Sequence, residues 1–285
     1  MAKFNHKHTM FTLNCRGKLV VIEKPLVMGI LNITNDSFYA GSRLQDPEAV
    51  LTRAGQMIAD GADILDIGGQ STRPGSVRIS EEAEMKRVLP AIEMLIKKFD
   101  TAIISIDTYH AAVAKSAVNA GASIVNDISG GTMDQNMLET VASLAVPYIC
   151  MHMKGVPETM HHDPRYENIT KEILDFFIKR INECRRSGIK DIIVDPGFGF
   201  GKTIEQNFIL LKNLCLFKML DTPVMAGISR KSTIYKTLNT EVGDSLNGTT
   251  VLNTLALQNG ANILRVHDVK EAKEAVMLFE AYTKA

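Results

Sequence analysis

The chain has 285 residues, of which 45% are hydrophobic, and its 32 basic side chains balance 32 acidic ones. This balance gives no overall field that would attract nucleic acid or an anionic membrane surface. No run of about 18 apolar residues predicts a membrane span, and the N-terminus, MAKFNHKHTM, lacks the apolar core of a signal peptide. The four cysteines are scattered without a C-x-x-C pair. This pattern favours free thiols in the cytoplasm over disulfides or a thiolate metal site.

The first elements along the chain are a hairpin and a buried strand. Residues 11–23, FTLNCRGKLVVIE, hold two apolar runs separated by Arg16 and Gly17, which suit a tight turn. The next apolar run, residues 26–33, predicts a buried strand, and after Asn32 it gives way to a turn-forming polar run. A polar loop is therefore expected at the mouth of this strand.

One pattern then recurs: a glycine that suits the left-handed end of a helix, a short apolar run, and a polar residue. It occurs in residues 60–69, 119–130, 187–199 and 259–268. Four more apolar runs lie before or between these segments, at 26–33, 101–108, 146–153 and 222–229. The segments between the apolar runs have the stripe of amphipathic helices, with starts expected near Pro47 and Ser80.

Apolar strands that alternate with amphipathic helices predict a parallel sheet covered on its faces. The eight strand–helix units favour a (β/α)8 TIM barrel over an open doubly wound sheet. We expect one domain over residues 1–285, in which the hairpin, within residues 1–25, closes the bottom of the barrel.

Polar or ionisable residues follow every predicted strand. In chain order they are Asn32; Asp66; Asp107; Asn126 and Asp127; His152; Asp195; Ser229, Arg230 and Lys231; Arg265, His267 and Asp268. A TIM barrel has its active site at the carboxyl ends of its strands, so these side chains are expected on one rim. Each alone is compatible with a structural cap. Together, the carboxylates and amides suit a polar heterocycle and the basic groups suit an anion.

Two loops add anion-binding character. The loop GGQSTRPGS at 68–76 offers backbone N–H groups and a guanidinium, and GISRKST at 227–233 runs from a strand into a helix start. Either alone is compatible with an ordinary loop or helix start. Other motifs are rejected: the histidines at 161–162 lack zinc-site spacing, and the GKT at 201–203 lacks the preceding P-loop glycine. No nucleophile signature or dinucleotide fingerprint occurs.

Taken together, several segments resemble dihydropteroate synthase in the order of that family. They are MGILNITNDSF (28–38), DIGGQSTRPGS (66–76), SIDTYH (105–110), VNDISG (125–130), DPGFGFGK (195–202), GISRKS (227–232) and RVHDV (265–269). The resemblance implies a TIM-barrel transferase of folate biosynthesis. This enzyme joins p-aminobenzoate to 6-hydroxymethyl-7,8-dihydropterin diphosphate and releases diphosphate. The resemblance also implies assistance by Mg²⁺, inhibition by sulfonamides and a homodimer.

The same resemblance assigns roles to individual residues. Pterin binding is expected of Asp107, Asn126, Met151, Asp195, Lys231 and Arg265. Diphosphate binding is expected of Asn32, Thr72, Arg73, Arg265 and His267, with Asn32 also near Mg²⁺. The p-aminobenzoate site is expected to contain Phe38, Phe200, Lys231 and Ser232, with the carboxylate at the helix start after Arg230. Catalytic contributions are expected of Asp36, Asp107, Lys231 and Arg265.

The implied chemistry is a substitution at the pterin methylene carbon. Loss of diphosphate leaves a cation that the dihydropterin ring delocalises, so the enzyme needs no nucleophile of its own. The first loop departs from the family pattern, because Asn35 stands where the family has proline and Ala40 where it has aspartate. This departure leaves open how the loop from Thr34 to Ser42 contributes to catalysis.

Two other functions are compatible with a pterin-binding barrel. A methyltransferase of the same superfamily, acting on methyltetrahydrofolate with a corrinoid protein, would share the Asp/Asn/Asp pocket. A non-catalytic pterin-binding barrel would share it as well. Both are disfavoured because Arg73, Lys231, Arg265 and His267 suit the departure of a diphosphate, which neither function requires.

Overall fold

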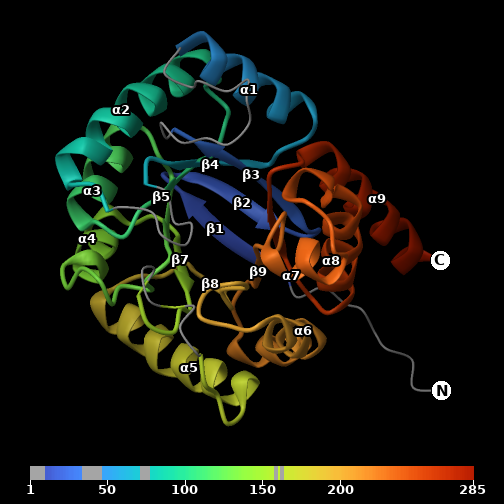
Figure 1. Cartoon of the computed structure of the whole chain (residues 1–285). Coiled ribbons are helices and arrows are strands. Elements are labelled where there is room, and N and C mark those ends of the chain that lie inside the picture. Colours follow the sequence, from blue (N-terminus) through green and yellow to red (C-terminus); the bar gives the residue numbers. More distant parts are fainter. Residues whose placement is uncertain (1–9, 34–46, 71–77, 157–159, 161–163) are drawn as a thin grey trace.

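The computed structural model contains an N-terminal hairpin and a ring of alternating strands and helices (Figure 1). It describes residues 10–33, 47–70, 78–156, 160 and 164–285. In the hairpin, β1 (Phe11–Cys15) pairs antiparallel with β2 (Lys18–Ile22). Arg16 and Gly17 lie between the two strands at φ angles of 56° and 86°, so the predicted turn is confirmed.

Eight parallel strands form the second sheet. In chain order they are β3 (Leu26–Asn32), β4 (Ile64–Gly68), β5 (Ile104–Asp107), β6 (Ile124–Asp127), β7 (Tyr148–Met151), β8 (Ile192–Asp195), β9 (Met225–Ala226) and β10 (Ile263–Val266). Their hydrogen-bonded order is β8-β7-β6-β5-β4-β3-β10-β9. A parallel bridge between Val194 and Val224 joins the two ends of this order. The sheet therefore closes into the predicted barrel.

Helices connect the strands and surround the barrel (Figure 1). Those in the described residues are α1 (Pro47–Ala59), α2 (Glu81–Lys98), α3 (Ala111–Ala120), α4 (Met137–Leu144), α5 (Ile169–Ser187), α6 (Ile204–Lys212), η1 (Leu214–Leu220), α7 (Ser232–Thr237), η2 (Val242–Asp244), α8 (Leu246–Gln258) and α9 (Val269–Lys284). The cap predicted at Ser80 is present, because its hydroxyl accepts the N–H of Ala83 over 3.3 Å.

The recurring glycines mark the turns from helix to strand. Gly61, Gly121, Gly188 and Gly260 have φ angles of 97°, 129°, 101° and 97°. These angles are accessible to glycine without the steric cost that a Cβ brings. The predicted left-handed glycines are therefore confirmed at four of the turns that lead from a helix into a strand of the barrel.

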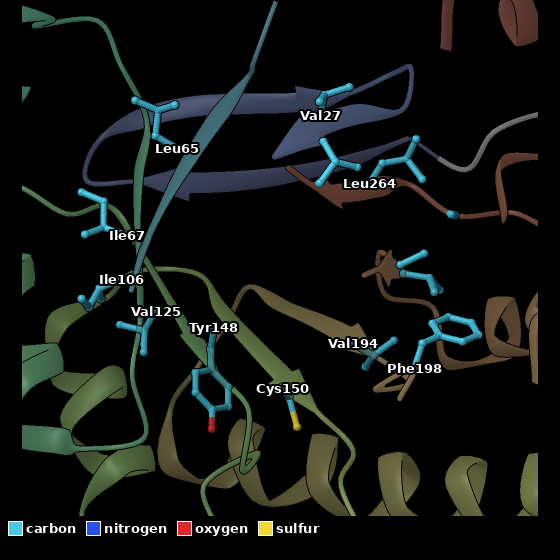
Figure 2. Packing of buried hydrophobic residues seen from close by; sticks show 14 of the residues in the cluster. Val27, Leu65, Ile67, Ile106, Val125, Tyr148, Cys150, Val194, Phe198 and Leu264 are labelled. Carbon is cyan, nitrogen blue, oxygen red and sulfur yellow. The ribbon is translucent and has the colours of Figure 1, made fainter. Parts of the chain in front are cut away.

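The outward face of the strands packs beneath the helices. Figure 2 shows part of this layer, in which Val27, Ile67 and Tyr148 come from three different strands. They belong to one buried cluster with helix residues that include Val88 of α2 and Phe177 of α5. Because the other face of each strand lines the barrel interior, both faces are buried and the strands are almost continuously apolar.

The inward face is apolar at the amino ends of the strands. A second buried cluster there includes Met28, Ile64, Ile103, Ile124, Ile149, Ile193, Met225 and Ile263. The hairpin residues Leu13, Cys15 and Ile22 belong to the same cluster. The hairpin therefore covers the bottom of the barrel, as the sequence predicts.

Removing a hairpin side chain from this cluster tests its contribution to stability. Leu13 is 1% exposed, so we expect Leu13→Ala to lower the free energy of unfolding by about 2–5 kcal/mol. Urea denaturation followed by circular dichroism measures the change. Leu19 in the same hairpin is 64% exposed, and Leu19→Ala should cost less than about 0.5 kcal/mol. Equal effects of the two substitutions would contradict the packing described.

Candidate active site

The inward face becomes polar beyond the apolar layer. Side chains at positions i and i+2 of a strand share a face, so Ile64 is followed by Asp66 and Ile124 by Asn126. This alternation carries polar groups into the upper half of the barrel, above the cluster that the hairpin closes. The inward-facing positions toward the carboxyl ends hold Asn32, Asp66, Asp107, Asn126, Met151, Asp195 and Arg265.

Arg265 of β10 is held between carboxylates from two other strands. Its Nε donates to Asp66 Oδ2 over 2.7 Å, and its Nη2 donates to Asp107 Oδ2 over 2.6 Å. Asp66 Oδ2 also accepts a 3.0 Å hydrogen bond from Nδ2 of Asn126. The structure thus brings together Asp107, Asn126 and Arg265, which the family resemblance assigns to one pterin pocket.

Sequence reasoning missed the role of Asp66 in this group. Asp66 is in register with Ile30 and Ser105, whereas Asp107 is in register with Gly68. Asp66 therefore lies one inward-facing layer deeper than Asp107, and it is fully buried. The signal that could have found it is its position two residues after an inward-facing isoleucine, which places its carboxylate inside the barrel rather than under a helix.

Burial disfavours the charged forms of Asp107 and Arg265. It raises the pKa of Asp107, and the nearby Arg265 opposes that rise. Burial also disfavours the charge of Arg265, but the carboxylates of Asp66 and Asp107 outweigh it, so the pKa of Arg265 lies above its ordinary value. The guanidinium consequently stays charged and provides the positive side of a buried ion cluster.

Asp195 and Lys231 form a second polar group in the site. Asp195 Oδ1 accepts the N–H of Gly197 over 2.8 Å, and burial raises the pKa of this carboxyl. Lys231, the N-cap residue of α7, donates its Nζ to the carbonyl of Phe198 and lies 4.6 Å from the centre of the Phe200 ring. Burial lowers the pKa of Lys231 to about 8, and the charge of Asp195 opposes this shift.

A small cluster of apolar side chains lies beside Lys231. Met151 of β7 is buried with Tyr109 and Ile128, and Phe200 packs against the same cluster. Met151 is a predicted pterin residue and Phe200 a predicted p-aminobenzoate residue, and the two side chains belong to the same small cluster. Ser232, the first residue of α7, directly follows Lys231 and is partly exposed.

Two predicted anion-binding residues lie at other strand ends. Asn32 ends β3, and its Oδ1 lies 3.4 Å from the point where a Cβ on Gly68 would stand. His267 follows β10, with Nδ1 3.1 Å from the hydroxyl of Ser229, and its carbonyl accepts a 3.0 Å hydrogen bond from Arg53 of α1. Asn32 therefore lies at the end of β3, and His267 is held next to Ser229 directly after β10, the strand that carries Arg265.

Other polar residues at the strand ends serve the scaffold. Asp127 accepts hydrogen bonds of 2.7 Å from the Tyr148 hydroxyl and from the N–H of Gly131, so its carboxylate faces away from the barrel interior. Arg230 forms a two-bond pair with Asp268, at 2.8 Å from Nε and 2.7 Å from Nη2. This pair ties the loop before α7 to the start of α9.

Four predicted site residues lie outside the described residues: Asp36, Phe38, Thr72 and Arg73. Among the residues that are described, no three His, Cys, Asp or Glu side chains gather as ligands for a metal ion. No helix in the described ranges is long and apolar enough to cross a membrane. The four cysteines are free thiols, three of them buried and Cys215 exposed.

The family model described as "Pterin binding enzyme" matches residues 28–267 of the chain. The dihydropteroate synthase of Haemophilus influenzae is 41% identical over 275 residues, which cover 96% of this chain and 99% of that protein. The chain belongs to the dihydropteroate synthase family. The resemblance drawn from the sequence is therefore confirmed, as is the expectation of a transferase of folate biosynthesis.

Solved dihydropteroate synthases share the whole fold. A Yersinia pestis enzyme with a sulfonamide drug has a TM-score of 0.91 and 39% identity, over 96% of this chain and 99% of that one. A Xanthomonas albilineans enzyme with 4-aminobenzoic acid has a TM-score of 0.90 and 37% identity, over 97% of this chain and 100% of that one. The barrel is therefore the common architecture of this family.

The ion cluster can be tested by weakening its deepest carboxylate. Asp66→Asn keeps the shape but removes the charge that faces Arg265, so we expect kcat/KM for the pterin substrate to fall about 10- to 100-fold, in line with ~1.5–3 kcal/mol for a charged hydrogen bond. Steady-state kinetics on the purified variant measure this change.

Asp63 provides the matched control at the other end of the barrel. It precedes β4, and its Oδ2 accepts the N–H of Val27 over 2.8 Å and Nζ of Lys273 over 3.0 Å. Asp63→Asn should lower stability while leaving kcat/KM near that of the unmodified enzyme. If the two variants lose kcat/KM equally, the assigned role of Asp66 is wrong.

Proposed function

We propose that this chain catalyses the reaction of its family, in which p-aminobenzoate displaces diphosphate from 6-hydroxymethyl-7,8-dihydropterin diphosphate. The observation that carries the proposal is the buried set of hydrogen bonds that joins Arg265 to Asp66 and Asp107, and Asp66 to Asn126. A barrel interior that holds two carboxylates and a guanidinium is costly to bury without a polar ligand. A pterin ring, with donors and acceptors along its edges, supplies such a ligand.

Pterin recognition is assigned to the groups that face the barrel interior. The Asp195 carboxylate is proposed to accept hydrogen bonds from the 2-amino group and the N3–H of the ring. Asp107 and Asn126 would hold the opposite edge, Met151 would contact one face of the ring, and the guanidinium of Arg265 would lie against the flat ring. Buried polar groups that fit this edge would discriminate against rings that lack it, because they would be left unpaired.

Departure of diphosphate is assigned to the basic groups at the rim. Arg265 and His267 are proposed to stabilise the charge that develops on the leaving group, together with Asn32, Thr72 and Arg73. Cleavage of the C–O bond sends its electron pair to the diphosphate, and the electron-rich ring delocalises the resulting cation. The amine of p-aminobenzoate then forms the new C–N bond and loses a proton, so the chain supplies no nucleophile. Asp36 and Asp107 are proposed to assist.

The p-aminobenzoate subsite is assigned to Phe38, Phe200, Lys231 and Ser232. Phe200 and Lys231 already lie against each other, which gives an aromatic surface beside a cation. The Xanthomonas albilineans relative was solved with 4-aminobenzoic acid and the Yersinia pestis relative with a sulfonamide drug. We propose that both classes of compound bind this chain at the same subsite.

We further propose that Mg²⁺ assists the reaction. Asn32, at the end of β3, offers the ion a side-chain amide oxygen beside the pocket. That donor fits Mg²⁺, which keeps several waters and takes other oxygen ligands from substrate phosphates rather than from an all-protein cage. When bound, the ion would neutralise charge on the diphosphate.

A homodimer in the cytoplasm is the proposed state of the protein. α8 exposes Val251 and Leu255, and α9 exposes Met277, Leu278 and Tyr282. Exposed apolar side chains on neighbouring helices support a contact between two copies. Sedimentation of the protein would reveal a monomer if this assignment is wrong.

The activity is tested by supplying dihydropterin diphosphate, p-aminobenzoate and Mg²⁺ and measuring released diphosphate. We expect release that depends on p-aminobenzoate, which separates a synthase from a methyltransferase or a non-catalytic binder. Arg265→Ala removes the counter-ion of two buried carboxylates, so turnover should fall at least about 100-fold. Lys171→Ala, which removes a surface pair with Asp175, should retain the ordinary rate. No release at saturating substrates would refute the proposal.

The pH dependence of the reaction tests the charge of Lys231. Its pKa of about 8 means that the ammonium predominates below that pH and is lost above it. We therefore expect kcat/KM to decline as the pH rises through about 8. Lys231→Arg keeps a positive charge at alkaline pH and should lack this decline even if its rate is lower. An identical alkaline decline in Lys231→Arg would show that another group titrates.

A further inference from the structure

The loop that joins β8 to α6, residues 196–202, lies directly against the segment that follows β7. Gly197 and Gly201 have φ angles of 70° and 63°. A Cβ on Gly197 would collide with the carbonyl oxygen of His152, and one on Gly201 with the carbonyl oxygen of Lys154. The two stretches of backbone are therefore in direct contact, and a side chain at either glycine would push them apart.

Lys202 is 5% exposed and turns back beneath this loop. Its Nζ donates to the carbonyls of Gly197 and Phe200 over 2.8 and 3.0 Å, lies 3.1 Å from Nδ1 of His152, and also donates to the carbonyl of His152 over 3.4 Å. The third contact forms equally well if the ammonium donates to the imidazole or if an imidazole N–H donates to the neutral amine. With these partners the buried amine needs no water and no substrate.

His152 anchors this contact to the outer helices. Its ring packs edge-on against Phe176 of α5, with the ring centres 4.9 Å apart. Burial, followed by the charge of Lys202, lowers the pKa of His152 to about 2, so the imidazole is neutral at ordinary pH. The imidazole is thus a fixed polar partner rather than a group that exchanges protons with solvent.

The middle of the 196–202 loop contacts both α6 and Lys231 of the site. The N–H of Gly199 donates to the side-chain oxygen of Asn207 over 2.7 Å, which fixes the middle of the loop to α6. Between the two loop carbonyls that Lys202 binds, the carbonyl of Phe198 receives Lys231, and the ring of Phe200 lies beneath the same ammonium. Lys202 thus fixes the stretch of chain that shapes one side of the pocket.

We propose that Lys202, supported by His152, is a positioning residue for the second substrate: it holds the 196–202 loop so that Phe200 and Lys231 form the p-aminobenzoate side of the site. This inference rests on the proposed function. The ion cluster of the pterin side lies on β4, β5, β6 and β10, and among the described residues Lys202 hydrogen-bonds none of these strands. The loop touches the pterin side at Asp195 of β8, whose carboxylate accepts the N–H of Gly197. Loss of the Lys202 contacts should therefore affect the two substrates unequally.

Lys202→Met keeps the stem of the side chain and removes all polar contacts of Nζ. We expect KM for p-aminobenzoate to rise about 10- to 100-fold, as the loss of two or three hydrogen bonds implies, while binding of the pterin substrate measured by calorimetry changes less than about threefold. Lys154→Met is the matched control, because Lys154 lies on the adjoining segment but pairs with Glu172 and the ring of Tyr166. The control should leave both constants near their ordinary values.

A double-mutant cycle tests whether Lys202 acts through Phe200. Phe200→Leu and Lys202→Met should each raise KM for p-aminobenzoate, and the double variant should raise it little more than the larger single effect. If Lys202→Met does not fold, His152→Gln, which removes one contact, should still give a rise of roughly 2- to 5-fold. If the increase in KM of the double variant instead equals the product of the two single increases, Lys202 does not act through Phe200.

Amide hydrogen exchange separates this inference from the proposed activity, because it needs no turnover. In Lys202→Met, or in His152→Gln, the amides of residues 197–202 should exchange at least about tenfold faster, while β5 and β6 keep their protection. If the variants show faster loop exchange but the unmodified chain releases no diphosphate, the role of Lys202 in holding the loop is supported and only the proposed function is refuted. Unchanged loop exchange, or an equal rise in KM for both substrates, would overturn the inference.

Discussion

The guanidinium of Arg265 holds the upper half of the barrel together. It reaches carboxylates that lie 199 and 158 positions away in the chain, on β4 and β5. An unpaired charge in a buried interior is strongly destabilising, so each of these strand ends depends on the others for its counter-ion. The amide of Asn126 extends this dependence to β6. The site is consequently preorganised by the barrel, because the strands fix its members before any ligand arrives.

The same strands serve opposite ends of the barrel with different chemistry. At the amino ends, inward isoleucines and methionines meet the hairpin and exclude water. Two residues later the same face carries the polar groups of the site. Because the polar residues are only two positions from the packed apolar ones, the rigid strands hold the charged side chains in place. On β4, for example, Ile64 belongs to the apolar cluster that stabilises the barrel, and Asp66, two residues later on the same face, belongs to the site.

The sequence predicted the architecture well because its signals are local. Glycine at the helix ends, apolar runs and the Arg16–Gly17 turn each act within a few residues. The direction in which a side chain points is harder to predict, because strands buried on both faces lack a polar–apolar alternation that would set the phase. Asn126 and Asp127 are neighbours and look equivalent, yet only Asn126 faces the pocket. Asp66 and Lys202 went unassigned because their partners are brought close only by the register of the barrel and the fold of one loop.

The tight approach of Gly197 and Gly201 to the backbone after β7 also limits how this protein can change over evolutionary time. Side chains at those positions collide with carbonyl oxygens, and Lys202 depends on that close fit. The position in this loop that can vary at low structural cost is Phe200, whose ring is partly exposed. New variants that alter discrimination among aromatic amines should accumulate at that single side chain, while its neighbours stay the same across descendants.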